Sequence, residues 1–263
     1  RRSLVICLAL SVGLGALTVR RNEDYRSELA IWSDNVAKCP DNPWAHLNKG
    51  RALLATGPLS AAKEEFETSL RLKPDLAQAY NNLGVILDRQ GARTTEALED
   101  YRRAAELAPN LTDAHYNLAI SLHRMGRLDE AIQQYREVVK ATPYDSAAQC
   151  ALGSALAQQG HMAEALATFE ETVRIAPKFA GAHYNLGNVL AQTGRLTEAL
   201  AEYETAIQIK PEYAEAHYNF GLTLFQLHRL PEAIEQYKLA LQFKPGFTAA
   251  RNNLEQAQKA MTQ

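Results

Sequence analysis

The sequence predicts an all-α protein, a solenoid of repeated helix–turn–helix units, and two regularities lead to this prediction. The first is a ladder of prolines whose successive gaps are 34 residues, with a single gap of 35. The ladder consists of Pro40, Pro74, Pro109, Pro143, Pro177, Pro211 and Pro245. The second is a set of small, aromatic and polar positions that recur with the same period. A fixed period of about 20 to 50 residues is typical of solenoids.

The recurring positions assign each part of the unit. A small residue recurs at Gly50, Gly84, Ala119, Gly153, Gly187 and Gly221, and an alanine at Ala62, Ala97, Ala131, Ala165, Ala199 and Ala233. An aromatic residue recurs at Trp32, Phe66, Tyr101, Tyr135, Phe169, Tyr203 and Tyr237. We expect the small residues to let two helices approach closely, and the large ones to fill the space between successive units.

The turns and the ends of the helices also have their own markers. The turn inside each unit carries Gly57, Gly91, Gly126, Gly160 and Gly194, where the end of a helix needs a positive φ. His228 breaks this column, which predicts one weaker turn. Each proline of the ladder follows a second helix and ends it.

A period of 34 residues resembles the tetratricopeptide repeat (TPR). Six complete units are predicted, at residues 43–76, 77–111, 112–145, 146–179, 180–213 and 214–247. Residues 22–42 are predicted to form an N-terminal capping helix, and residues 248–263 a polar C-terminal one. The resemblance implies a right-handed superhelix whose concave inner face is lined mainly by the first helix of each unit.

An apolar run precedes the repeats. Residues 3–19 carry no charge and lie between Arg1-Arg2 and Arg20-Arg21. A helix of this length spans about 25 Å, close to the thickness of the hydrocarbon core of a bilayer. We therefore predict a transmembrane helix over residues 1–21, which contacts the lipid bilayer through residues 3–19; a signal peptide and a buried soluble helix are the alternatives. The two arginine pairs balance, so charge does not set the orientation.

The candidate binding residues lie on the first helices. An asparagine column comprises Asn48, Asn82, Asn117, Asn185, Asn219 and Asn253, and tyrosine directly precedes three of its members, at Tyr116, Tyr184 and Tyr218. In TPR proteins that hold extended peptides, the matching column faces the concave groove and hydrogen-bonds the peptide backbone. An amide side chain both donates and accepts, so it can pair with any peptide. The alternative is that these amides bond a neighbouring helix of the array, and the two roles are compatible.

Several other classes of protein are disfavoured by the sequence. Lys and Arg total 28 and Asp and Glu total 30, so no basic excess points to nucleic acid. The histidines at 46, 115, 183 and 217 recur at the repeat period, one or two units apart, which is too far to share a metal ion. No phosphate-binding loop, nucleophile elbow or zinc-protease motif is present. We therefore predict no catalytic residue, no metal and no cofactor for this chain.

The segment that joins the apolar run to the repeats carries a second resemblance. Its features are Arg21-Asn22, Tyr25, Glu28, Leu29, Trp32, Pro40, Asn42, His46, Asn48 and Gly50. Over residues 3–57 the chain resembles the membrane-to-TPR junction of the transmembrane-and-TPR family of protein O-mannosyltransferases. The resemblance implies a glycosyltransferase region with many membrane spans before the repeats, and repeats on the extracytoplasmic side, periplasmic or lumenal.

These observations predict a non-catalytic platform, tethered to a membrane, that binds proteins or extended peptides on its concave face. The resemblance makes it the C-terminal, acceptor-presenting region of a polytopic glycosyltransferase-like membrane protein. One alternative is a stand-alone, membrane-anchored TPR scaffold for the assembly of a membrane or envelope complex. Another is the TPR portion of a soluble enzyme of the O-GlcNAc transferase type.

Overall fold

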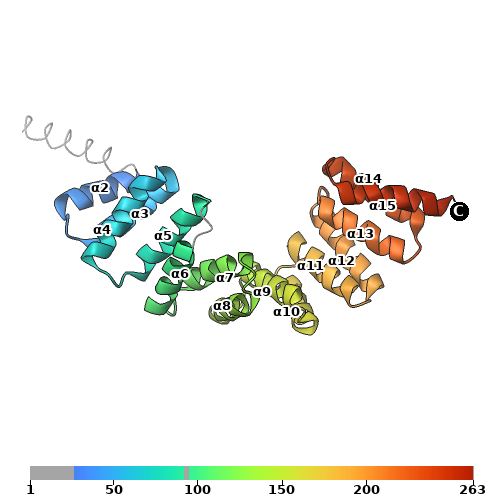
Figure 1. Cartoon of the computed structure of the whole chain (residues 1–263), viewed down its shortest axis with the longest axis horizontal. Coiled ribbons are helices and arrows are strands. Elements are labelled where there is room, and N and C mark those ends of the chain that lie inside the picture. Colours follow the sequence, from blue (N-terminus) through green and yellow to red (C-terminus); the bar gives the residue numbers. More distant parts are fainter. Residues whose placement is uncertain (1–26, 92–94, 263) are drawn as a thin grey trace, which may run out of the picture. The chain divides into compact units, whose positions relative to one another are not determined.

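The computed structural model describes residues 27–91 and 95–262. The described residues form fourteen α-helices and no β-strand (Figure 1). This confirms the predicted all-α class. They are α2 (Glu28–Lys38), α3 (Pro43–Thr56), α4 (Leu59–Leu72), α5 (Ala77–Arg89), α6 (Thr95–Leu107), α7 (Thr112–Arg124), α8 (Leu128–Ala141), α9 (Ser146–Gln159), α10 (Met162–Ile175), α11 (Ala180–Gln192), α12 (Leu196–Ile209), α13 (Ala214–Gln226), α14 (Leu230–Phe243) and α15 (Thr248–Met261).

The predicted transmembrane helix, residues 1–21, lies outside the described residues. Across residues 27–91 and 95–262, none of the helices has both the length and the hydropathy that crossing a bilayer requires. The prediction for the apolar run therefore stays a prediction.

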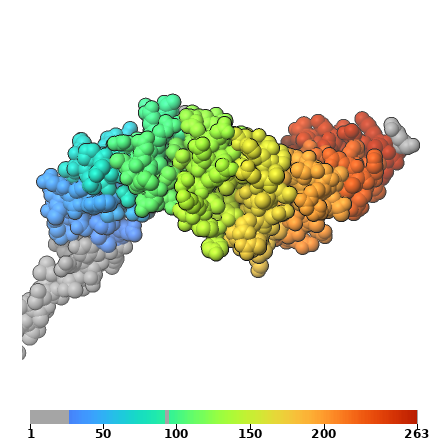
Figure 2. Space-filling model, turned by 90° about the horizontal axis from the view of Figure 1, so that it is seen from below, coloured from blue at the N-terminus to red at the C-terminus, as the bar shows by residue number. Residues whose placement is uncertain are grey.

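The chain divides into two compact parts, one up to Leu118 and one from Ala119 onward. In the first part α2 packs on α3, α3 on α4, α4 on α5, and α5 on α6. In the second part the same succession runs from α8 to α15, and Figure 2 shows it as consecutive bands of colour. Odd-numbered helices, which are the first helices of the predicted units, also contact each other directly: α9 with α11, α11 with α13, and α13 with α15. They therefore form one continuous face of the second part.

Close contacts between glycine and an aromatic ring join the two helices of a unit. A Cβ atom added to Gly187 would lie 2.7 Å from Cε1 of Tyr203, closer than packed atoms can approach. The same arrangement pairs Gly50 with Phe66, Gly84 with Tyr101, Gly153 with Phe169, and Gly221 with Tyr237. All five rings are buried. Each ring packs on the glycine of its own unit, because only a residue without Cβ leaves room for the ring. Tyr203 also lies against the following unit, as the sequence predicted, since it lines a cavity with Asn219 and Thr223.

The turns inside the units follow the glycine column with two differences. Gly91, Gly126, Gly160 and Gly194 have the expected positive φ. Gly57 does not: its φ is −118° and its ψ is −172°, because Pro58 follows and restricts the preceding residue to extended conformations. His228 takes a φ of 58°, so the turn keeps its left-handed residue although glycine is absent.

The carbonyl oxygens of the ladder prolines are hydrogen-bonded by side chains of the first helices, six residues further along the chain. His46, His115, His183 and His217 place Nε2 at 2.8 to 3.0 Å from the carbonyl oxygens of Pro40, Pro109, Pro177 and Pro211. Gln149 and Arg251 occupy the same slot and donate to Pro143 and Pro245. These contacts satisfy a backbone oxygen in the turn that a helix end leaves without an intrahelical partner.

Candidate functional site

The asparagine column lies where the sequence places it, on first helices. Its members belong to α3, α5, α7, α11, α13 and α15, and all six side chains are half-buried. Side chains in such positions can bond within the protein and still present atoms to solvent. What the column can bind therefore depends on which of its polar atoms are already hydrogen-bonded within the protein.

Four of the amides donate a hydrogen bond to the preceding unit. Each uses Nδ2, and each acceptor stands one position before the asparagine slot of that unit. The pairs are Asn117 with Asn81 Oδ1 at 2.9 Å, Asn185 with Cys150 Sγ at 3.2 Å, Asn219 with Tyr184 Oη at 3.1 Å, and Asn253 with Tyr218 Oη at 3.1 Å. The amides thus join neighbouring first helices, which is the alternative role that the sequence left open.

Asn82 shows why this ladder of hydrogen bonds is interrupted in the first part of the chain. The residue at its acceptor slot is Leu47, a buried side chain with no polar atom. Within residues 27–91 and 95–262, the amide of Asn82 accordingly makes no hydrogen bond. The chemistry of one side chain in the preceding unit therefore decides whether a column member is bonded.

The carbonyl oxygens of the column have a different status. Asn219 donates a second hydrogen bond from Nδ2, to Asn188 Oδ1 at 2.8 Å, so both of its N–H groups are used. Its own Oδ1 accepts no hydrogen bond from the described residues, and the same is true of Asn253 Oδ1. At Asn219 the column therefore presents an acceptor alone, rather than the donor–acceptor pair that an unbonded amide would offer.

Two of the tyrosines that precede the column pack against an aromatic residue at the end of their own unit. The ring of Tyr184 lies 4.9 Å from that of Tyr213, and the ring of Tyr218 lies 4.8 Å from that of Phe247, measured between centroids. Such tilted contacts are favourable for aromatic pairs. Tyr116 is half-buried on α7. All three side chains are half-buried, so only part of each faces solvent.

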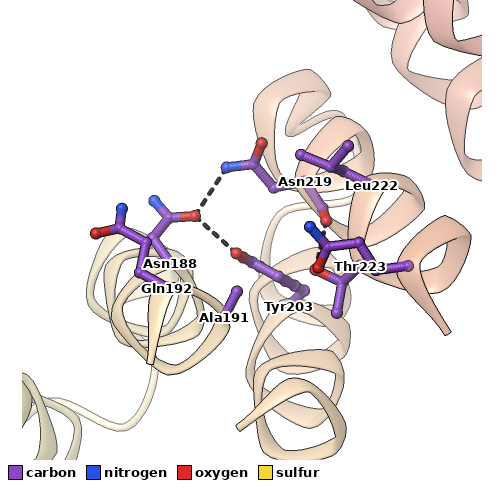
Figure 3. Close-up of a pocket in the computed structure, with 8 residues that line it drawn as sticks. Asn188, Ala191, Gln192, Tyr203, Asn219, Leu222 and Thr223 are labelled. Carbon is purple, nitrogen blue, oxygen red and sulfur yellow. Dashed lines mark hydrogen bonds between the residues drawn. The ribbon is translucent and has the colours of Figure 1, made fainter. Parts of the chain in front are cut away.

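A cavity of about 320 Å³ opens between α11, α12 and α13. It is lined by Asn188, Ala191, Gln192, Tyr203, Asn219, Leu222, Thr223 and Gln226. Figure 3 shows Asn188 between two donors: its Oδ1 accepts from Tyr203 Oη at 2.8 Å and from Asn219 Nδ2 at 2.8 Å. Asn188 was not predicted as a site residue because its slot carries no repeated chemistry, being Ser154 one unit earlier and Leu222 one unit later.

A second cavity, of about 290 Å³, lies one unit further along, between α13, α14 and α15. It is lined by Leu222, Phe225, Gln226, Tyr237, Asn253 and Gln256. Its walls repeat those of the first cavity, with Tyr237 in place of Tyr203 and Asn253 in place of Asn219. One exchange changes its chemistry: Leu222 occupies the slot of Asn188, so no amide accepts from the tyrosine. The Tyr237 hydroxyl is buried and has no hydrogen-bond partner in the described part of the chain.

His183 is one of the histidines that contact a proline carbonyl oxygen, and a carboxylate also lies beside it. Nδ1 of His183 lies 2.6 Å from Glu202 Oε2, while Nε2 faces the Pro177 carbonyl oxygen. Both neighbours are acceptors, an arrangement that favours the protonated ring. The hydrogen bond to Glu202 raises the pKa of His183 above its ordinary value. Metal binding is a separate matter: in residues 27–91 and 95–262, no three His, Cys, Asp or Glu side chains are grouped to hold an ion.

The helical pairs and the polar face on the first helices define the class of protein, an α-helical repeat solenoid. Family models described as TPR repeat or tetratricopeptide repeat match residues 45–76, 75–143, 110–178, 156–205, 187–228 and 214–247. These matches follow one another without a gap from residue 45 to residue 247. The chain belongs to the tetratricopeptide repeat family.

Comparison with individual proteins gives one relative by sequence and several by structure. A protein O-mannosyl-transferase of Caenorhabditis elegans is 28% identical over 74 residues, which are 28% of this chain and 11% of that protein. YrrB, a TPR protein described as having an unusual peptide-binding site, superposes with a TM-score of 0.61 at 23% identity, over 73% of this chain and 99% of YrrB. PilF of Pseudomonas aeruginosa gives 0.68 at 19% identity, over 81% of this chain and 97% of PilF. The two structures share the fold with this chain.

Proposed function

We propose that this chain is a non-catalytic platform that binds extended polypeptide along its first helices. The observation that carries the proposal is the asparagine column, whose half-buried carbonyl oxygens at Asn219 and Asn253 have no partner within the described residues. An extended peptide presents backbone N–H groups, which need acceptors. YrrB, which shares the fold, is described as a TPR protein with an unusual peptide-binding site, and this supports a peptide as the class of ligand.

The spacing of the column also suits an extended chain. Packed helices lie about 8–10 Å apart, and an extended polypeptide advances about 3.3 Å per residue. Successive asparagines would therefore meet about every third residue of the ligand. Contacts to the backbone do not depend on sequence, so the ligand class is an unstructured protein segment rather than one fixed motif.

We further propose that residues 3–19 tether the platform to a membrane, with the repeats on the extracytoplasmic side. In this proposal the chain is the acceptor-presenting region of a polytopic glycosyltransferase-like protein. The junction resemblance over residues 3–57 and the match to an O-mannosyl-transferase support it. Membrane fractionation of cells that express the protein, followed by protease digestion of sealed vesicles, tests both parts. Repeats that are recovered without membrane, or digested from the cytoplasmic side, would contradict it.

A pair of substitutions at Asn253 tests the binding face. Asn253→Ala removes the acceptor, whereas Asn253→Asp keeps an acceptor and lets the Tyr218 hydroxyl donate to the carboxylate. We expect Asn253→Ala to weaken binding of a fluorescent, unstructured peptide by about 2- to 10-fold, the value of one net hydrogen bond. Asn253→Asp should bind like the unmodified chain. Fluorescence anisotropy with the full chain in detergent measures both, and equal weakening by the two variants would refute an acceptor role.

A further inference from the structure

The hydroxyl group of Tyr237 is an exception among the buried polar atoms of this chain. The side chain is 0% exposed, and its oxygen has no hydrogen-bond partner among residues 27–91 and 95–262. Buried polar groups in folded proteins are nearly always paired, since leaving one unpaired is costly. An orphaned hydroxyl in the wall of a cavity therefore points to a partner that enters from outside.

The neighbouring cavity shows what that partner must supply. There the equivalent hydroxyl, on Tyr203, donates to the amide oxygen of Asn188 at 2.8 Å. At the equivalent place in the second cavity the side chain is Leu222, which cannot accept. The missing group is thus an amide-type oxygen at the position that Asn188 Oδ1 fills one unit earlier.

The second cavity also contains an acceptor for the NH₂ group of an amide. Asn253 lines it, and the Oδ1 of Asn253 accepts no hydrogen bond from the described residues. The cavity is thus lined by a donor, Tyr237 Oη, and an acceptor, Asn253 Oδ1, and such a pair is complementary to the C=O and NH₂ groups of a primary amide. Burial raises the pKa of Tyr237 to about 12, so its hydroxyl keeps the proton and can donate at neutral pH.

We propose that this cavity binds the primary amide side chain of an Asn or Gln residue in the bound polypeptide. The proposal rests on the peptide-binding function proposed above and adds a side-chain preference to it. None of the six lining residues is charged, so a carboxylate would lose its hydration without gaining a cation. An aliphatic side chain would fill the space but leave the hydroxyl unpaired.

A ligand side chain can reach the hydroxyl from the α15 side of the cavity. Gln256 stands there on the last helix and is exposed, so its flexible side chain can turn aside. The opposite wall consists of Leu222 and Phe225 on α13, whose apolar atoms pack against the methylene groups of the incoming residue. The cavity therefore combines an apolar wall with two polar contacts, as ligand sites commonly do.

Three peptides and two variants test the preference. The peptides share a glycine–serine background and differ in one central residue, which is Gln, Glu or Leu. With the full chain in detergent, we expect the Gln peptide to bind about tenfold more tightly than the other two. Tyr237→Phe should abolish this ratio. Tyr203→Phe, the matched change in the first cavity, should keep it.

The free protein provides a second readout, because the two hydroxyls differ before any ligand binds. Tyr237→Phe removes an unpaired hydroxyl, so its melting temperature should stay the same or rise. Tyr203→Phe removes a hydrogen-bonded one, so its melting temperature should fall. A clear fall for Tyr237→Phe would mean that its hydroxyl is already paired, and would overturn the proposal.

The outcomes separate this inference from the proposed function. Equal binding of all three peptides would leave the platform standing and overturn the amide cavity. If no peptide binds, the platform fails, and crystals of the full chain soaked in propionamide still decide the cavity. Amide density within hydrogen-bond distance of Tyr237 Oη and Asn253 Oδ1 would support the proposal, and an empty cavity would overturn it.

Discussion

Asn219→Ala should destabilise the second part of the chain, because the Asn219 amide is one of the links between units. The substitution removes two hydrogen bonds, from Nδ2 to Tyr184 Oη at 3.1 Å and to Asn188 Oδ1 at 2.8 Å. At a net value of about 0.5–1.5 kcal/mol each, the loss is about 1–3 kcal/mol. Both former partners are half-buried and can turn to water, which favours the lower half of that range.

Asn82→Ala is the matched control for this measurement. Asn82 occupies the same column on α5, but Leu47 stands at its acceptor slot and its amide is unbonded in the described residues. Both substitutions gain the same helix propensity, a few tenths of a kcal/mol, so the difference between them isolates the hydrogen bonds. We expect Asn82→Ala to be neutral or slightly stabilising.

Native-state hydrogen exchange is the appropriate assay, because repeat arrays unfold in neighbouring units and a single melting curve averages over them. Asn219→Ala should lower protection in α11 and α13, while α5 in the Asn82→Ala variant keeps its protection. Small and equal effects at both positions would refute the reasoning that the amide donors hold neighbouring units together.

Three further predictions concern packing, charge and backbone strain. Gly187→Leu would drive a side chain into the Tyr203 ring and cost about 1–3 kcal/mol or more, with lost exchange protection centred on α11 and α12 rather than spread over all helices. The pKa of His183 is raised above 6.5 by Glu202, so its contribution to stability is full below about pH 6.5 and is lost as pH rises through the raised value. His183→Gln introduces the residue that Gln149 supplies one unit earlier. In this variant the urea-denaturation midpoint should differ less between acidic and alkaline buffers than it does in the unmodified chain. His228→Gly should raise the melting temperature, since it relieves a left-handed residue worth about 1 kcal/mol; a fall would count against strain.

The order of helices and their closest contacts were predictable from the sequence because they depend on chemistry that repeats. Gly187 and Tyr203 are each one member of a column, and a column of small residues facing a column of rings has few ways to pack. The positive φ predicted for Gly57 was wrong for a local reason that is visible in the sequence. Pro58 follows Gly57 and restricts it to an extended conformation. The contact of each ring with the glycine of its own unit was not predicted, because periodicity alone does not say which of two neighbouring helices a side chain faces.

The functional chemistry was less predictable because it depends on departures from the repeat. Asn188 and Leu222 occupy one slot, and their difference decides whether a tyrosine hydroxyl is paired. Nothing in a single chain marks such a slot until the structure shows that it faces the tyrosine. The hydrogen-bond partners of the asparagines were within reach in principle, since each acceptor lies about one unit earlier in the sequence, but the choice of Nδ2 over Oδ1 comes from side-chain orientation.

Hydrogen bonds within the array use N–H groups of the asparagine column, and this changes what the column can recognise. An amide with all its groups open could pair with both the N–H and the C=O of a peptide, and a column of such amides would hold a backbone strongly and without preference. The donors of Asn219 are used within the array and its acceptor remains, so at this position a peptide backbone bound as proposed would gain a partner for its N–H group only. Backbone contacts there would supply less of the affinity, and selection among ligands would shift to the side chains that enter the cavities. The first cavity has its tyrosine hydroxyl satisfied by Asn188, whereas the second presents an unpaired donor on Tyr237. Under the proposed function, ligand preference should therefore be set chiefly between α13 and α15, where Leu222 replaces the amide that Asn188 supplies one unit earlier.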